Sequence, residues 1–552
     1  MLDSPEELNE QGIEHASEGR IEEAITCFRR ALELRPDYAE ALGHLGAALA
    51  DAGEYAEGIA ALEQSLLLEP ESAEIHYNLG YALQAMGKRE EAIDALHKAI
   101  ALKHPYAEAA YQLGRALNDL GRYEDAATSL RISLEEDPGD LDSLLELGHS
   151  LLKLEKFDEA AAHYERALDF HPADSEVWHS LGVARGRAGR EDEALRAYRR
   201  AVDLRPDYAK ALNNLALILE KRGEAGEAES LYRRALDADP GDSTVWFNLA
   251  SLLFGKEEFA ESAACYRNAL EIGGDDAETF YELGRALARA EKYEEAFAAL
   301  ERAHAIAPRE SYPLSEMGNV YRALQEWEKA LDYYTRALVL RPDDAGMVNN
   351  VGVALSDLER YEEALPYFER ALAFEPEDPE FLFNLARTLD DLDADDRAIA
   401  AYRRAIEIRP DYQKALCNLG SALIRADEYQ EAAQICQRAL ELNPDEWQSL
   451  NDLGIALRHL GRYDEALAAL RRAVDVDPAR HHALANMGNV YGDLGRHADA
   501  IESYRKVVRI APDYALGHYG LAVSLLDGGC STEAQREFAE AHRLDPELHP
   551  PE

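Results

Sequence analysis

The sequence has few cysteines, few lysines and no long apolar run. Its five cysteines stand alone, without a CxxC pair, so neither a disulfide framework nor a cysteine-rich zinc site is expected. No apolar run approaches the roughly 20 residues that a membrane-spanning helix needs. Residues 1–12 have neither the basic segment nor the apolar core of a signal peptide. These absences predict a cytoplasmic protein without membrane insertion.

Positive charge is scarce as well, because 58 basic residues stand against 107 acidic ones and the formal net charge is −49. Such a surface repels nucleic acid and attracts partners with basic segments. Only 12 of the basic residues are lysines, and an acidic, lysine-poor composition is also typical of proteins adapted to high salt. The sequence leaves both origins of the acidity open, but it argues against a nucleic-acid partner.

Motifs of enzymes and metal sites are missing too. The sequence contains no P-loop, GxSxG, HExxH or EF-hand pattern. Its many carboxylates recur on helix faces that should be solvated, where they are poor candidates for an acid–base pair. The only adjacent histidines, His481 and His482, should point apart on a helix, which disfavours joint metal ligation. We therefore predict that the chain is not an enzyme and has no cofactor and no metal.

What the sequence does have is a period of 34 residues without insertion or deletion. With Pro5 as position 1, residues 5–548 make sixteen repeats. Position 8 is Gly or Ala in all sixteen, position 20 is Ala in fourteen, position 27 is Ala in thirteen, and position 32 is Pro in fourteen. Position 24 is aromatic in ten repeats and Leu in five, and Cys436 takes it in repeat 13 as a small core residue. A period of this length indicates a solenoid.

Each repeat holds two helices, A and B. Positions 4, 7, 8 and 11 form one stripe at helical spacing, and positions 20, 24, 27 and 28 form another. Small residues at positions 8 and 20 allow the two helices to approach closely, and the large residue at position 24 fills the space beside them. A turn such as Gly121–Ala126 ends helix A, and the proline at position 32 ends helix B.

This pattern of small, large and proline positions resembles the tetratricopeptide repeat (TPR) family over 544 of 552 residues. The resemblance implies an all-α, right-handed superhelical solenoid of sixteen antiparallel helix pairs, with helix A lining a concave groove. We expect repeats 1–8 over residues 5–276, repeats 9–16 over 277–548 and a C-terminal tail over 549–552. The junction at 272–276 has two glycines and no proline, so it is either a flexible site or a loop that has drifted neutrally.

Position 6 of helix A supplies the candidate binding site, since in this family it faces the groove. Asparagine takes this position in seven repeats, at Asn78, Asn214, Asn248, Asn350, Asn384, Asn418 and Asn486. A primary amide both donates and accepts hydrogen bonds, which suits an extended peptide backbone. The set resembles the asparagine ladder of O-linked N-acetylglucosamine transferases, although Asn-Leu-Gly could also simply be common at this point of the repeat. We expect that replacing Asn350, Asn384 and Asn418 by Ala weakens peptide binding without lowering the melting temperature.

These observations predict a protein–protein interaction scaffold that binds an extended or helical peptide segment in its concave groove. A second hypothesis is a substrate-recruiting subunit of a protein glycosyltransferase or of another enzyme encoded separately, because no residues remain here for a catalytic domain. We expect a monomer, since Gln535 and His542 make the outer face of the last repeat polar and disfavour end-to-end stacking.

Overall fold

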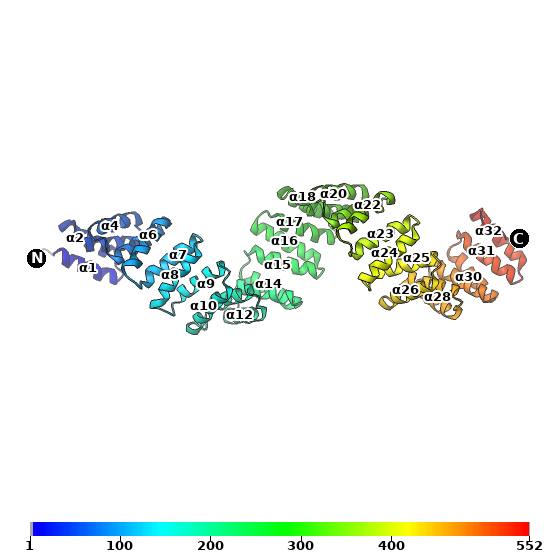
Figure 1. The fold of residues 1–552 in the computed structure, drawn as a ribbon, viewed down its shortest axis with the longest axis horizontal. Helices are drawn as coiled ribbons and strands as arrows, with labels where there is room; N and C mark the ends of the chain where they lie inside the picture. Colours follow the sequence, from blue (N-terminus) through cyan, green and yellow to red (C-terminus); the bar gives the residue numbers. More distant parts are fainter. Residues whose placement is uncertain (1–3, 551–552) are drawn as a thin grey trace. The chain divides into compact units, whose positions relative to one another are not determined.

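The computed structural model describes residues 4–550, and all regular structure in this part of the chain is α-helical (Figure 1). Its thirty-two helices, two for each repeat, confirm the expected all-α stack of sixteen antiparallel helix pairs. The last two residues of the expected tail 549–552 lie outside the described residues. Contacts divide the chain into two compact units, one up to Gly274 and one from Asp275.

The first unit contains repeats 1–8, in which odd-numbered helices are A helices and even-numbered helices are B helices. They are α1 (Pro5–Ser17), α2 (Ile21–Leu34), α3 (Ala39–Asp51), α4 (Tyr55–Leu68), α5 (Ala73–Ala85), α6 (Arg89–Leu102), α7 (Ala107–Asp119), α8 (Tyr123–Glu136), α9 (Leu141–Lys153), α10 (Phe157–Phe170), α11 (Ser175–Arg187), α12 (Glu191–Leu204), α13 (Ala209–Lys221), α14 (Ala225–Ala238), α15 (Ser243–Gly255) and α16 (Phe259–Gly273).

The second unit contains repeats 9–16 in the same order of A and B helices. They are α17 (Ala277–Arg289), α18 (Tyr293–Ile306), α19 (Tyr312–Ala323), α20 (Trp327–Leu340), α21 (Ala345–Asp357), α22 (Tyr361–Phe374), α23 (Pro379–Asp391), α24 (Asp395–Ile408), α25 (Gln413–Arg425), α26 (Tyr429–Leu442), α27 (Trp447–His459), α28 (Tyr463–Val476), α29 (His481–Asp493), α30 (His497–Ile510), α31 (Ala515–Asp527) and α32 (Ser531–Leu544).

The expected junction at 272–276 contains the end of α16. That helix runs one residue further than the other B helices, to Gly273, and Gly274 follows with a φ of 85°. A φ in this range favours glycine, because a Cβ would crowd the following carbonyl oxygen. The second glycine of the junction therefore has a conformational role, and bending at this point stays a prediction.

The turn from helix A to helix B has the same backbone conformation in every repeat. Position 15 has a positive φ in all sixteen, for example 74° at Gly121 and 59° at Glu359. Nine repeats place glycine there, and seven place Glu, Gln or Asp. Since only glycine adopts this conformation without a steric penalty, the fold imposes the turn even where the residue does not favour it.

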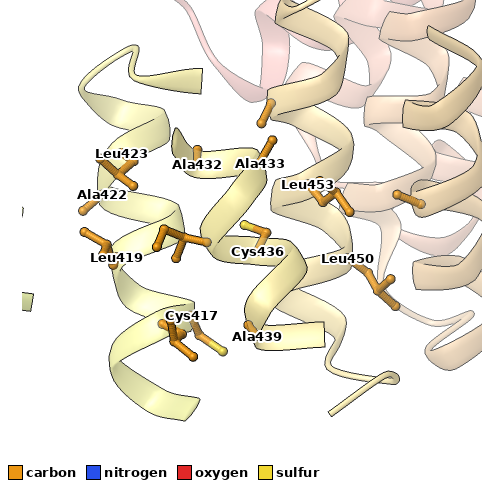
Figure 2. Packing of buried hydrophobic residues seen from close by; sticks show 14 of the residues in the cluster. Cys417, Leu419, Ala422, Leu423, Ala432, Ala433, Cys436, Ala439, Leu450 and Leu453 are labelled. Atoms are coloured by element: carbon orange, nitrogen blue, oxygen red, sulfur yellow. The ribbon is translucent and has the colours of Figure 1, made fainter. Parts of the chain in front are cut away.

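The predicted packing of small against large positions is confirmed, as repeat 13 illustrates. A Cβ on Gly420, at position 8, would come within 2.8 Å of the Cys436 Sγ at position 24. Cys436 is buried and belongs to a core cluster with Leu419, Leu423 and Ala432 (Figure 2). Cys436 is therefore a core residue, as the sequence predicts. In other repeats position 24 holds the largest fully buried side chains, among them Tyr232, Tyr266, Tyr334 and Tyr402.

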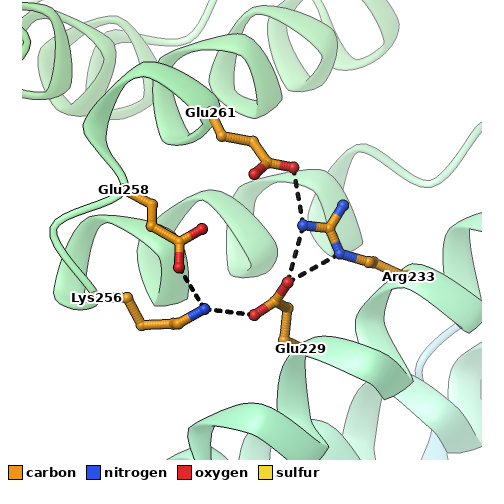
Figure 3. A network of polar contacts seen from close by, with 5 residues as sticks. All are labelled: Glu229, Arg233, Lys256, Glu258 and Glu261. Atoms are coloured by element: carbon orange, nitrogen blue, oxygen red, sulfur yellow. Dashed lines mark hydrogen bonds and ion pairs between the residues drawn. The ribbon is translucent and has the colours of Figure 1, made fainter.

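Arginines connect the B helices of successive repeats. An arginine at position 25 pairs with a glutamate at position 19 of the next repeat, 28 residues later, in Arg29–Glu57, Arg131–Glu159, Arg199–Glu227, Arg233–Glu261, Arg403–Glu431 and Arg505–Glu533. Figure 3 shows one of these pairs, in which Arg233 also binds Glu229 at 2.8 Å and Lys256 lies 2.6 Å from Glu229. Because exposed ion pairs contribute only about 0–1 kcal/mol each, these contacts fix the stacking register more than they add stability.

The A helices form the inner layer of each unit. A helices of successive repeats contact one another, as α3 and α5 do in the first unit and α25 and α27 do in the second. In the described residues, B helices of successive repeats approach one another less closely. The layer whose members approach more closely is the inner layer of a curved stack, so the A helices line the concave side within each unit.

Candidate functional site

The seven position-6 asparagines all lie on A helices and are half-buried. In the first unit, α5 carries Asn78, α13 carries Asn214 and α15 carries Asn248. In the second unit, α21 carries Asn350, α23 carries Asn384, α25 carries Asn418 and α29 carries Asn486. Four of the five successive A helices from α21 to α29 therefore present an amide at the same place. We call these four residues the asparagine row.

Five of the seven amides hydrogen-bond to position 5 of the repeat before them. In each case the Nδ2 contacts the side chain at position 5 of that repeat, 35 residues earlier in the chain. The pairs are Asn214 with His179 (3.1 Å), Asn248 with Asn213 (2.9 Å), Asn350 with Ser315 (3.3 Å), Asn384 with Asn349 (3.0 Å) and Asn486 with Asn451 (2.8 Å). Our sequence analysis missed this contact, although its signal is present: a polar residue at position 5 is followed 35 residues later by Asn.

Asn418 bonds to a different position of the preceding repeat. Asn418 follows Phe383, and its Nδ2 donates instead to the Tyr402 hydroxyl at 3.2 Å. His179, by contrast, can accept a hydrogen bond from Asn214, because burial lowers the pKa of His179 to about 4 and keeps the imidazole neutral. Asn418 thus bonds to position 24 of the preceding repeat, whereas the five asparagines above bond to position 5.

These bonds give the asparagines a structural role, and their role in peptide binding stays a prediction. A primary amide has two N–H donors and one carbonyl acceptor, and the bond to the preceding repeat uses one N–H. That bond leaves the second N–H and the Oδ1 for further hydrogen bonds. Replacement by Ala removes an inter-repeat hydrogen bond, typically worth about 1 kcal/mol. These bonds argue against the expectation that such replacements leave the melting temperature unchanged.

Asp452 on α27 interrupts the asparagine row. It occupies position 6 and is buried, with Oδ2 accepting from the Ser421 hydroxyl at 2.5 Å and Oδ1 accepting from the Asn451 amide at 3.3 Å. Asn451 in turn accepts from Asn486, and Gln448 donates to Ser421 at 2.8 Å. Burial raises the pKa of Asp452 to about 6, and the two hydrogen bonds oppose that shift. A buried carboxylate with a raised pKa thus lies in the middle of the row.

Arginines on the concave side of the second unit are paired with carboxylates. Arg322 lies 2.6 Å from Asp357, and Arg458 lies 2.6 Å from Asp493, again across successive repeats at a spacing of 35 residues. Arg285, at position 9 of α17, contacts Glu282 at 2.9 Å. These guanidinium groups are neutralised within the protein, so they do not oppose a basic ligand.

An open cleft of about 640 Å³ lies at the C-terminal end of the asparagine row. Its lining includes Trp447, Asn451, Ile455, His482 and Asn486. An amide of the row is therefore exposed next to an aromatic ring in a space large enough for a side chain of a bound peptide.

The two adjacent histidines at this cleft do not point apart as expected. The rings of His481 and His482 stack with centroids 4.1 Å apart, and the Tyr514 ring lies 4.5 Å from His481. The pair stands in the first turn of α29, and the ring of Tyr514, the last residue of the same repeat, packs against both imidazoles. In residues 4–550 no group of three or more potential metal ligands occurs, and no helix there is long and apolar enough to cross a bilayer.

Comparison with protein-family models gives tetratricopeptide repeat matches along most of the chain. Models described as tetratricopeptide repeat match residues 77–140, 117–182, 179–243, 242–309, 317–382, 352–413 and 417–481, and one described as TPR repeat matches 12–52, 46–87 and 488–529. The chain belongs to the tetratricopeptide repeat family. Proteins built of TPR repeats typically bind proteins or peptides and are in general non-catalytic scaffolds, so this chain is a TPR protein–protein interaction scaffold.

Among curated proteins, none matches the sequence. Similar solved structures include YrrB, described as a TPR protein with an unusual peptide-binding site (23% identity, 34% of this chain and 95% of that chain, TM-score 0.32). Yeast Tom70 (18%, 77% and 96%, 0.36) and the APC/C hetero-tetramer Cut9–Hcn1 (16%, 94% and 96%, 0.34) are similar over more of this TPR chain. With TM-scores below 0.5, these similarities carry no argument about what the chain binds.

Proposed function

We propose that this TPR scaffold binds an extended peptide segment of a partner protein along the A helices of its second unit. The observation that carries the proposal is the asparagine row, in which the same amide recurs on α21, α23, α25 and α29. Each amide retains hydrogen-bonding capacity after its internal bond. Amides repeated at one place suit a ligand whose own donors and acceptors repeat, as those of a peptide backbone do.

The internal bonds favour binding because they orient the amides before a ligand arrives. Asn384 is held by Asn349 at 3.0 Å and Asn486 by Asn451 at 2.8 Å, so these side chains lose little further rotamer freedom on binding. Backbone recognition by amides depends little on the peptide sequence. Selectivity would then come from side-chain sites beside the row, such as the cleft next to Trp447.

The acidity of the chain favours a ligand with basic residues. The net charge is −49, and the groove arginines of the second unit are paired with Asp357, Asp493 and Glu282. Long-range attraction of this kind accelerates association and weakens as salt rises, because the screening length is about 8 Å at physiological ionic strength. The affinity of the selected peptides should therefore decrease with added salt.

The test begins with selection of binding peptides from a random peptide library by the full chain. The dissociation constant of each selected peptide is then measured for the wild type, for Asn384→Ala and for Asn349→Ala. Asn349→Ala is a matched control, because it removes the same inter-repeat bond but keeps the Asn384 amide. We expect Asn384→Ala to weaken binding by about three- to tenfold, as the loss of one or two hydrogen bonds implies, and Asn349→Ala to weaken it less. Equal effects of the two variants, or a selection that yields no binding peptide, would refute the proposal.

A further inference from the structure

A second cleft, of about 700 Å³, lies at the A–B turns of repeats 9 and 10. We call it the Tyr321 cleft. Its lining includes the rings of Tyr293, Phe297 and Tyr321 and the carboxylates of Glu291, Glu294 and Glu326. It is formed by the end of α19, the two turns and the first residues of α18 and α20, whereas the asparagine row begins on α21. Its volume is within the range of ligand pockets in proteins, about 300–1,000 Å³.

The aromatic lining of this cleft departs from the repeat pattern. Tyr321 is at position 11, where twelve of the sixteen repeats have leucine. Its ring stacks on Tyr333 with centroids 5.4 Å apart and meets the edge of Phe297 at 5.3 Å. The Lys329 ammonium lies 5.1 Å from the Tyr321 ring centroid and also pairs with Glu326. The ring is therefore already in contact with a cation from its own chain.

Repeat 6 shows what the surrounding carboxylates can hold. Position 11 of that repeat is Arg185, whose side chain is only 12% exposed, and its guanidinium pairs with Glu193 at 3.1 Å and with Asp158 and Glu165 of repeat 5. The residues of repeat 9 that correspond to Asp158 and Glu165 are Glu294 and Glu301. Repeat 9 thus keeps these two carboxylates, of which Glu294 lines the Tyr321 cleft, but repeat 10 has no guanidinium at position 11.

Repeat 15 shows what the aromatic ring can hold. Position 11 is again a tyrosine, Tyr491, and the guanidinium of Arg496 lies 4.8 Å from the centroid of its ring. Arg471 of the preceding repeat donates to the Tyr491 hydroxyl at 3.1 Å. The residue that corresponds to Arg496 in repeat 10 is Glu326. Repeat 15 thus supplies its cation from position 16, where repeat 10 has a carboxylate, and the cation on the Tyr321 ring comes from Lys329 at position 19 instead.

We propose that the Tyr321 cleft binds a cationic side chain, guanidinium or ammonium, of a partner protein. Three aromatic rings and the excess of glutamates over the two lysines of the cleft complement such a group in shape and charge. The bound cation would take the place of the Lys329 ammonium on the Tyr321 ring and would pair with Glu326 and Glu294. This site is distinct from the groove proposed above and would work alongside it.

The test uses N-acetyl-arginine methylamide and N-acetyl-lysine methylamide as probes, titrated into the full chain and followed by ligand-observed NMR. N-acetyl-citrulline methylamide, which has the shape of the arginine probe without its charge, is the control ligand. We expect saturable binding of at least one cationic probe. The citrulline probe should bind at least threefold more weakly, since a cation–π contact of this kind raises the binding affinity by a factor of about 2–30.

Two substitutions in the cleft separate this proposal from a general charge effect. Tyr321→Leu introduces the residue that twelve other repeats have at position 11, so the variant should fold normally. It should lower the affinity for the cationic probe at least threefold. Lys329→Ala removes the cation that now contacts the ring, so it should strengthen binding. Tyr491→Leu in repeat 15 and Asn384→Ala in the groove should leave probe binding unchanged, because neither residue lies in the cleft.

The proposal is overturned if neither cationic probe binds, if the citrulline probe binds as tightly as the arginine probe, or if Tyr321→Leu leaves the affinity unchanged. Preference for one probe supports the proposal and identifies the partner side chain as arginine or lysine. The groove proposal is tested with the selected peptides, and the cleft proposal is tested with the single amino-acid probes. Either proposal can therefore be refuted without the other.

Discussion

Replacement of Asp452 by Asn would complete the amide series from α21 to α29 and should stabilise the second unit at neutral pH. Burial raises the pKa of Asp452 from its ordinary value of 3.8 to about 6, because the charged form is poorly solvated between α25 and α27. The hydrogen bonds from Ser421 and Asn451 only partly offset this cost. An asparagine at the same place bears no charge and can keep both contacts, because its Oδ1 can accept from Asn451 while its Nδ2 donates to the Ser421 Oγ.

The sign of the pH dependence follows from the raised pKa. The folded chain binds the Asp452 proton more tightly than the unfolded chain, so the stability contributed by this group is highest below pH 3.8. It decreases as the pH rises from 3.8 to about 6, and it is constant above that. The wild type and Asp452→Asn should therefore have similar stability near pH 3.5, and the variant should become the more stable one as the pH rises.

The size of the effect is set by the difference between the two pKa values. About two pKa units correspond to about 3 kcal/mol at pH 7.5, and about half of that difference is expected at pH 5. This figure is an upper estimate, since the hydrogen bond between Ser421 and the charged carboxylate is stronger than the bond that an amide would form with Ser421. Asp464→Asn is the matched control, because it removes an exposed carboxylate from the same repeat.

Hydrogen exchange followed by mass spectrometry is the suitable measurement, because long repeat proteins unfold locally and a single free energy of unfolding does not describe them. Segments from α25, α27 and α29 should exchange more slowly in Asp452→Asn than in the wild type at pH 7.5, after correction for the intrinsic rates. The reasoning would be refuted if Asp452→Asn and the wild type were equally protected from exchange at pH 7.5. It would also be refuted if Asp464→Asn increased the protection as much as Asp452→Asn does.

Other parts of the structure give further predictions. Asn384→Ala and Asn349→Ala should each lower the stability of the second unit by about 1 kcal/mol in hydrogen exchange, because both remove the same inter-repeat bond; an unchanged protection of α21 and α23 would contradict this. Glu359→Gly should raise the thermal midpoint, since φ is 59° there, whereas Gly121→Ala at a φ of 74° should lower it, each by about 1 kcal/mol in free energy. If the two substitutions shifted the thermal midpoint in the same direction, the positive φ at position 15 would not determine the stability of the turn.

The repeat architecture could be predicted from the sequence, because it depends on residues close together in the chain. Gly420 and Cys436, for example, are sixteen residues apart and meet within one helix pair. The 34-residue period makes the same local packing recur sixteen times, so the preference for a small or large residue at each position can be recognised from many repeats. The turn at position 15 shows the limit of this reasoning, since glycine marks it in nine repeats while Glu359 adopts it without that signal.

The candidate site could be placed from the sequence only in part. The asparagines were located on the A helices, but their internal partners depend on a register of 35 residues that connects one repeat to the next. The burial of Asp452 and the aromatic lining of the Tyr321 cleft likewise arise where side chains of neighbouring repeats meet. The sequence by itself determined the fold of each helix pair, because packing within a pair is local. Only the tertiary structure decided which polar groups are already bonded and which are available, because that depends on the distances between atoms of different repeats.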